Sequence, residues 1–122
     1  MTAPSITPLP RQVVLVGNPN SGHVKDGMAR ARAAIVREGL QILETVRLHE
    51  LERLRSWVNR PDDERPLIVA AGGDGTIGGV CGYVAGTGAV LGIVPLGTSN
   101  DIARSFDIPM RIEDAVHLIH HG

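Results

Sequence analysis

Three short polar segments of this sequence carry residues suited to binding a phosphate, and each follows an apolar run. The middle segment reads Gly72-Gly73-Asp74-Gly75-Thr76. Its glycines remove side chains, so backbone N–H groups can approach an anion at the positive end of a following helix. A tight turn with an Asp or Thr helix cap is the alternative, because the same residue types are common there.

The charge pattern draws attention to Asp74. Between Pro66 and Ala103 the only charged residues are Asp74 and Asp101, and each lies in one of the polar segments. A carboxylate facing a triphosphate would repel it, so Asp74 should accept hydrogen bonds from loop amides or ligand hydroxyls, or work with Mg²⁺. We take Asp74 as the candidate catalytic residue. A structural carboxylate that only ties the loop together is the alternative.

The first polar segment spans residues 18–22. Asn18 and Ser21 are uncharged hydrogen-bond partners, Pro19 stiffens the turn, and Gly22 precedes an expected helix. The sequence has no P-loop pattern of the Gly-x-x-x-x-Gly-Lys-Ser/Thr type. Taken alone, this segment therefore fits an ordinary turn equally well.

The third polar segment spans residues 95–101. Its residues from Thr98 to Asp101 form a dense polar cluster ahead of Arg104. That is more than helix capping requires, although a capping segment is the alternative.

The elements that would position these segments alternate along the chain. Short apolar runs predict strands at 13–16, 40–48, 67–71 and 89–94, and helical spacing predicts helices at about 28–38, 51–58, 77–85 and 111–121. Alternation of this kind predicts an α/β fold, a Rossmann-like three-layer sandwich with a parallel sheet. The more polar second strand should lie near the sheet edge. Ligands of such folds bind beyond the carboxyl ends of the strands, so the three segments should meet at one edge.

Length and composition narrow the class of protein. The chain has 122 residues, a formal net charge of −1 and few aromatic residues, which predicts one domain and argues against nucleic acid as a partner. No apolar stretch is long enough to span a membrane. The single Cys81 and the lack of a signal-like start favour the cytoplasm. Residues 1–10, with three prolines, are expected to be a disordered lead-in to a domain at 11–122.

Histidines near the end of the chain raise the question of a metal. His117 and His121 stand four residues apart on the expected last helix, a spacing that could hold a metal ion. The favourable interaction of a basic side chain with the partial negative charge at a helix C-terminus explains these histidines more simply.

The order Asn-Pro-x-Ser-Gly, then Gly-Gly-Asp-Gly-Thr about fifty residues later, then Pro-Leu-Gly-Thr-x-Asn-Asp resembles the catalytic region of diacylglycerol kinases and related bacterial lipid kinases. The resemblance covers residues 12–122. It implies that the three segments contact ATP and that a threonine at the end of the second strand, Thr45 here, does so too. The expected nucleotide contacts are Asn18, Pro19, Asn20, Ser21, Gly22, Thr45, Gly72, Gly73, Asp74, Gly75, Thr76 and Thr98, with Asn100 and Asp101 on the side of the acceptor substrate.

The same resemblance implies the activity. An enzyme of this family would use ATP and Mg²⁺ to transfer the γ-phosphate to the hydroxyl of diacylglycerol or a similar lipid alcohol, acting in the cytoplasm at the inner membrane face. It implies a second, β-rich domain beyond residue 122 that supplies the catalytic base and much of the Mg²⁺ site. Residues 1–122 alone would then be inactive. One departure is Gly78, where many relatives carry Asn.

Two other functions stay open at this point. Gly-Gly-Asp-Gly-Thr also occurs in NAD kinases, although these lack the pattern of the third segment. A non-catalytic nucleotide-binding or dimerising module is the other alternative, and a homodimer is allowed for.

Overall fold

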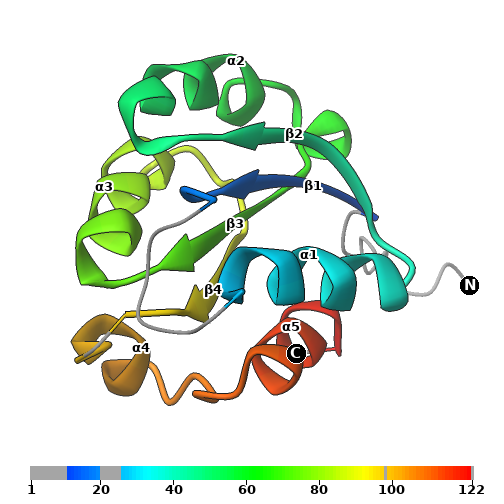
Figure 1. Cartoon of the computed structure of the whole chain (residues 1–122). Coiled ribbons are helices and arrows are strands. Elements are labelled where there is room, and N and C mark those ends of the chain that lie inside the picture. The colour runs from blue at the N-terminus through cyan, green and yellow to red at the C-terminus, as the bar shows by residue number, and fades with distance from the viewer. Residues whose placement is uncertain (1–10, 20–25, 98, 122) are drawn as a thin grey trace, which may run out of the picture.

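The computed structural model describes residues 11–19, 26–97 and 99–121, and its centre is a parallel sheet of four strands (Figure 1). These strands are β1 (Gln12–Val16), β2 (Gln41–Val46), β3 (Leu67–Gly72) and β4 (Leu91–Pro95), in the order β2-β1-β3-β4. All three pairings are parallel. The predicted α/β sandwich is confirmed, and the polar second strand does lie at an edge.

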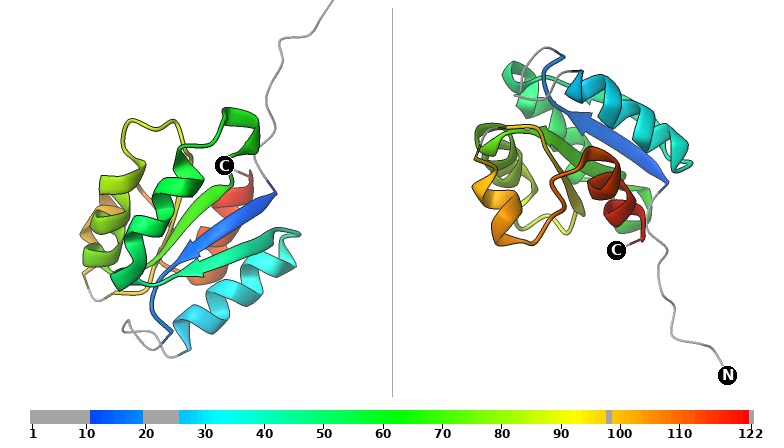
Figure 2. Two further views of the ribbon diagram at one scale, coloured as in Figure 1. Left: turned by 90° about the horizontal axis from the view of Figure 1, so that it is seen from above. Right: turned by 60° about the horizontal axis from the view of Figure 1, so that its bottom comes forward.

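Helices cover both faces of the sheet (Figure 2). On one face α1 (Gly27–Arg37) and α5 (Ile112–His121) pack against Val13 and Leu15, and on the other α2 (Leu54–Val58) and α3 (Asp74–Val84) pack against Val14 and Val16. Alternate residues of a strand point to opposite faces, so a run that is apolar in both phases is buried on both sides. This is why the short β-branched runs predicted the strands well.

The helix boundaries depart from the sequence-based expectation in three places. The helix expected at 51–58 is a 3₁₀ helix, η1 (Leu48–Arg53), followed by α2, and Glu50 inside η1 has non-helical dihedrals (φ −119°, ψ 17°). Helix α3 begins at Asp74 rather than near residue 77. Two short helices, η2 (Asp62–Glu64) and α4 (Asp101–Ser105), were not predicted.

Helix α3 contains Gly78, Gly79 and Gly82, and a glycine inside a helix costs about 1 kcal/mol relative to alanine. One of the three has a packing reason. A methyl group added at Gly79 would lie 3.1 Å from Cδ1 of Leu51, so Gly79 lets η1 approach the helix. Gly78 and Gly82 show no such crowding: the nearest atom to a methyl at Gly78 is 3.9 Å away, and none lies within 4 Å at Gly82. Close approach therefore accounts for Gly79 alone.

Polar contacts fasten α1 to α5. Nη2 of Arg30 donates to Oε1 of Glu113 at 2.9 Å, and this hydrogen bond lowers the pKa of the Glu113 carboxyl. Nδ1 of His117 and Nδ1 of His120 each lie 3.0 Å from an oxygen of Glu38. No group of three or more potential ligands that could hold a metal ion exists among the described residues, and the His121 side chain lies outside them. The imidazoles thus take part in packing the two helices together.

An apolar cavity of about 580 Å³ runs along β4. Its walls come from α3, β4, α5 and the segment before α5, and they include Cys81, Val90, Phe106 and Leu118. None of the described residues of the three polar segments lines it. In the part of the chain that the structure covers, no helix has the length and apolar character needed to cross a membrane.

Candidate functional site

The described parts of the three polar segments lie at one edge of the sheet, as predicted. Asn18 follows β1, Gly73 and Asp74 follow β3, and Gly97 follows β4, each at the carboxyl end of its strand. The amide of Leu96 donates to the carbonyl of Gly72 at 2.8 Å, which joins the last two strand ends. Asn20, Ser21, Gly22 and Thr98 lie outside the described residues.

Glycines let the backbones at this edge touch. A methyl group at Gly97 would lie 2.5 Å from Cα of Gly73, and one at Gly17 would lie 2.5 Å from the carbonyl oxygen of Ala71. Real side chains do not approach this closely, so the strand ends can meet only with hydrogen at these positions. Gly17 lets the end of β1 lie against β3 directly before the first two segments, and Gly97 brings the third segment against the second.

The start of α3 has no side-chain cap from its N-cap residue. Gly73 is the N-cap residue in an extended conformation, and it offers no side-chain cap to the first-turn amides. Gly75 is exposed, and a methyl group there would meet no atom within 4 Å. Backbone N–H groups at the start of a helix carry a partial positive charge and bind phosphate readily. Phosphate binding by the glycine segment stays a prediction.

Gly72 and Thr76 form the inner side of this turn. Thr76 is only 7% exposed, and its Oγ1 would lie 2.7 Å from a methyl group at Gly72. The threonine therefore packs against the Gly72 backbone.

Asp74 binds backbone amides of the third segment. Its Oδ2 accepts the N–H of Asp101 at 3.0 Å and its Oδ1 accepts the N–H of Ile102 at 3.0 Å. These are the first two residues of α4, so a carboxylate on α3 caps a helix 27 residues further along the chain. Of the roles weighed for Asp74, acceptance from loop amides is the one present in this structure. Catalysis by Asp74 stays a prediction.

Asn100 closes the third segment on itself. It is 8% exposed and in the left-handed conformation (φ 52°), where its Oδ1 accepts the Gly97 N–H at 3.0 Å and its Nδ2 donates to the Gly97 carbonyl at 2.9 Å. Asp101 carries an exposed side chain next to it. Asn100 therefore builds the loop, and its predicted place on the acceptor side is untested, as is that of Asp101.

Asn18 and Pro19, the described residues of the first segment, follow β1, and Thr45 belongs to the neighbouring strand β2. Oδ1 of Asn18 accepts the N–H of Leu48 at 3.3 Å, and Pro19 is exposed. Thr45, one residue before the end of β2, accepts a hydrogen bond from Nη2 of Arg32 at 2.8 Å. Asn18 thus holds the start of η1 against the end of β1.

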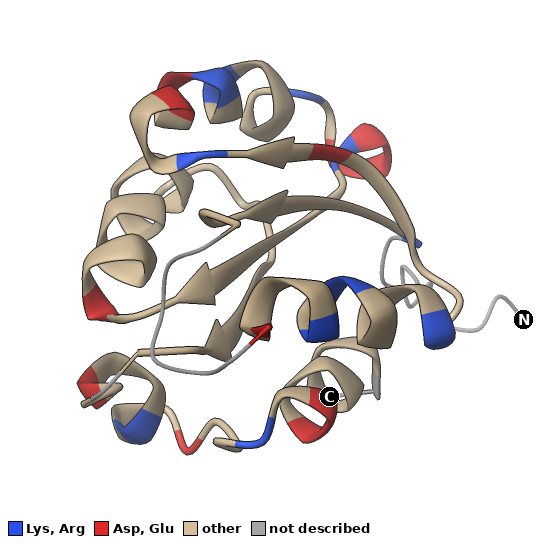
Figure 3. Cartoon of the chain, viewed as in Figure 1, with Lys and Arg blue, Asp and Glu red and all other residues tan. Residues whose placement is uncertain are grey.

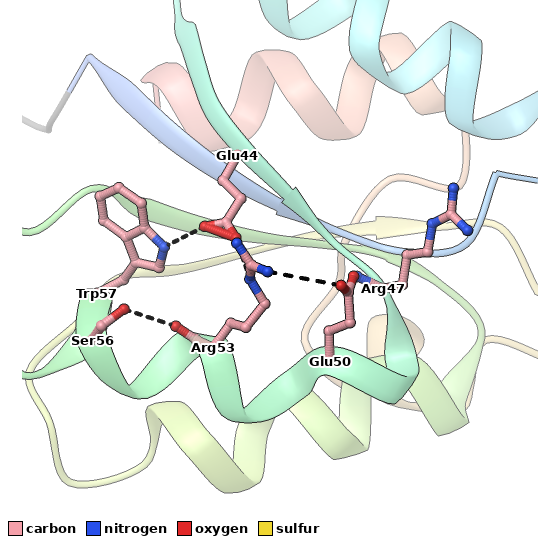
Figure 4. Close-up of polar contacts among 6 residues, drawn as sticks. All are labelled: Glu44, Arg47, Glu50, Arg53, Ser56 and Trp57. Atoms are coloured by element: carbon pink, nitrogen blue, oxygen red, sulfur yellow. Dashed lines mark hydrogen bonds and ion pairs between the residues drawn. The ribbon is translucent and has the colours of Figure 1, made fainter.

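A polar network between β2 and the η1–α2 segment holds η1 in place (Figure 4). Glu44 accepts hydrogen bonds from Nε of Arg53 at 2.5 Å and from Nε1 of Trp57 at 2.9 Å, and Oε1 of Glu50 accepts the N–H of Arg47 at 3.1 Å. The network contains no predicted nucleotide contact. Its effect on the site is indirect, because it positions the residues around Leu48.

Comparison with known protein families identifies the family of this chain. The model of the diacylglycerol kinase catalytic domain matches residues 12–122. The chain belongs to this family. A diacylglycerol kinase of Mycobacterium tuberculosis is 32% identical over 105 residues, covering 82% of this chain and 33% of the relative. A crystal structure of a diacylglycerol kinase from Bacillus anthracis superposes with a TM-score of 0.70 at 25% identity, covering 91% of this chain and 43% of that one.

Family membership confirms the resemblance drawn from the three motifs and favours the lipid kinase interpretation over an NAD kinase. The chain spans about a third of the length of the mycobacterial relative and less than half of the Bacillus chain. The sequence analysis allowed for amide acceptance by Asp74 and for a capping segment at 95–101, but it predicted neither α4 nor the amides of Asp101 and Ile102 as the partners. The run of Thr, Ser, Asn and Asp from residue 98 to residue 101, residue types that are usual at a helix start, was the available signal.

Proposed function

We propose that this chain is the ATP-binding part of a lipid kinase, which transfers the γ-phosphate of ATP to the hydroxyl of diacylglycerol or a similar lipid alcohol. The observation that carries the proposal is the α3 N-terminus without a side-chain cap, placed at the edge where the glycine segments touch. The polyphosphate would lie against the amides of Gly73 to Thr76, with Asn18, Thr45 and the third segment around it. The reaction would take place in the cytoplasm at the inner membrane face.

The described residues do not by themselves provide a Mg²⁺ site. They hold no cluster of three potential ligands, and both oxygens of Asp74 already accept backbone amides. Mg²⁺ prefers octahedral oxygen ligands and usually binds through one or two carboxylates and the substrate phosphates. Ligands from a second, β-rich domain of the whole protein would complete the metal site and supply the catalytic base.

A chain of residues 1–122 should therefore bind nucleotide weakly and transfer no phosphate. Positioning and metal electrostatics provide most of the catalysis in phosphoryl transfer, and this part holds only some of those groups. Calorimetry would measure ATP binding, and radiolabelled ATP with diacylglycerol vesicles would measure transfer. The whole protein is the positive control. Lipid phosphorylation by residues 1–122 would contradict the two-domain account, and absence of any ATP binding to the whole protein would contradict the proposed function.

Gly75→Ala tests the phosphate cradle without disturbing the fold. The new methyl group meets no protein atom within 4 Å, and Ala is favoured over Gly in a helix by about 1 kcal/mol, so stability should not fall. ATP affinity should drop about 10-fold or more, because the methyl group occupies the space where phosphate must approach the amides. The matched control is Gly82→Ala, another uncrowded position of α3. Equal ATP affinity of the two variants would remove Gly75 from the site.

A further inference from the structure

The three polar segments lack a positive charge to match a polyphosphate. Among their described residues the charged groups are Asp74 and Asp101, both carboxylates. Strands β3 and β4 carry no charged residue, and α3 carries only Asp74 at its start (Figure 3). A nucleotide triphosphate is strongly anionic, and Arg is the side chain best suited to bind its phosphates through two N–H groups at once.

Among the described arginines, Arg104 is hydrogen-bonded to one of these segments. Its Nε donates to the carbonyl of Ser99 at 2.9 Å, so the side chain reaches back along α4 toward the third segment. Long side chains of a helix lean toward its N-terminus, which agrees with this direction. Arg104 is exposed, and none of the ion pairs among the described residues involves it. Its two Nη groups therefore have donors to offer to a ligand.

The position of Arg104 is coupled to the start of α3. Asp74, the first residue of α3, caps α4 through the amides of Asp101 and Ile102, and the amide of Arg104 donates to the carbonyl of Asn100 within the next turn. Gly97, bonded twice to Asn100, touches Gly73. The guanidinium is thus carried by a helix that is fixed on the same turn as the proposed phosphate cradle.

We propose that Arg104 is a phosphate-binding residue, whose Nη groups contact the polyphosphate of the bound nucleotide. The proposal rests on the proposed function, because it assigns a further residue to the same ATP site. Ser99 would act as the positioning partner, since its carbonyl accepts the N–H of Nε and leaves both Nη groups outside this hydrogen bond.

The test compares ATP, ADP and adenosine as ligands of the whole protein, with affinities measured by calorimetry. Arg104→Ala should weaken ATP binding about 10- to 100-fold, the scale of losing a charge-assisted hydrogen bond, while adenosine affinity should stay unchanged. Arg104→Gln keeps a donor for Ser99 without the charge and should show the same selective loss. Arg37→Ala is the matched control. Arg37 is exposed in the last turn of α1, near the amino ends of the strands and so away from the three polar segments.

The outcomes separate the two levels of the proposal. ATP affinity of Arg104→Ala and Arg104→Gln within about twofold of the unchanged protein would overturn the role of Arg104 and leave the proposed function intact. Equal loss of adenosine and ATP affinity would also overturn it, because Arg104 would then act through the fold. Thermal unfolding of each variant identifies a folding defect, and Arg104→Gln decides the question if Arg104→Ala does not fold. Absence of ATP binding to the unchanged whole protein would overturn both.

Discussion

Replacing Asp74 by Asn is expected to reduce turnover of the whole enzyme about 100-fold or more, on the scale of losing one preorganised electrostatic contact. Both carboxylate oxygens of Asp74 accept backbone amides of α4 at 3.0 Å. Asn keeps the size of the side chain, but one of its ends is an NH₂ group, which would face a backbone N–H. The unsatisfied amide should cost about 1–3 kcal/mol and loosen α4.

The structure adds a measurement to this prediction. Hydrogen exchange of the Asp101 and Ile102 amides should become faster in Asp74→Asn, because one of these amides loses its acceptor. ATP affinity should survive better than turnover, since the amides at the start of α3 are unchanged. The matched control is Asp107→Asn, an exposed aspartate in the left-handed conformation (φ 55°) that Asn also adopts. Near-normal turnover at saturating ATP would show that Asp74 is structural, and its catalytic assignment would be withdrawn.

Gly97→Ala is expected to separate the second and third segments and to lower both stability and ATP affinity. The new methyl group would lie 2.5 Å from Cα of Gly73 and 3.1 Å from Oδ1 of Asn100. The first contact is with backbone, which cannot move aside as a flexible side chain can. Forcing a group into such a packed place typically costs about 1–3 kcal/mol, and ATP affinity should fall about 10-fold or more because the two segments no longer meet.

A graded series makes this second prediction specific. At Gly73 an added methyl group would lie 3.3 Å from Cα of Gly97, so Gly73→Ala should destabilise less than Gly97→Ala. At Gly78 the nearest atom would be 3.9 Å away, an ordinary contact, so Gly78→Ala should be neutral or stabilising. Urea unfolding gives the three free energies of unfolding. A Gly97→Ala variant as stable as Gly78→Ala would contradict the contact between the two segments.

The sequence by itself determined the sheet, the edge at which the three segments meet, and the family. The runs at Val13–Val16 and Leu67–Ala71 are apolar in both strand phases, and only a strand covered on both faces satisfies such a pattern. Each polar segment follows one apolar run: the first two follow the runs just named, and the third follows the run that ends before Pro95. In a parallel sheet these run ends share one edge, so the parallel topology places all three segments there. These features are local or follow from connectivity, which is why sequence patterns contain them.

Only the tertiary structure decided what individual side chains do at that edge. Asp74 could have faced a ligand, a metal or amides, and its partners are supplied by α4, which is too short to show a helical period in the sequence. Gly97 was one glycine among several until its contact with Gly73 showed that it cannot carry a side chain. Such roles depend on residues distant in sequence and brought within about 3 Å by the fold, a distance that hydrogen bonds and close packing require.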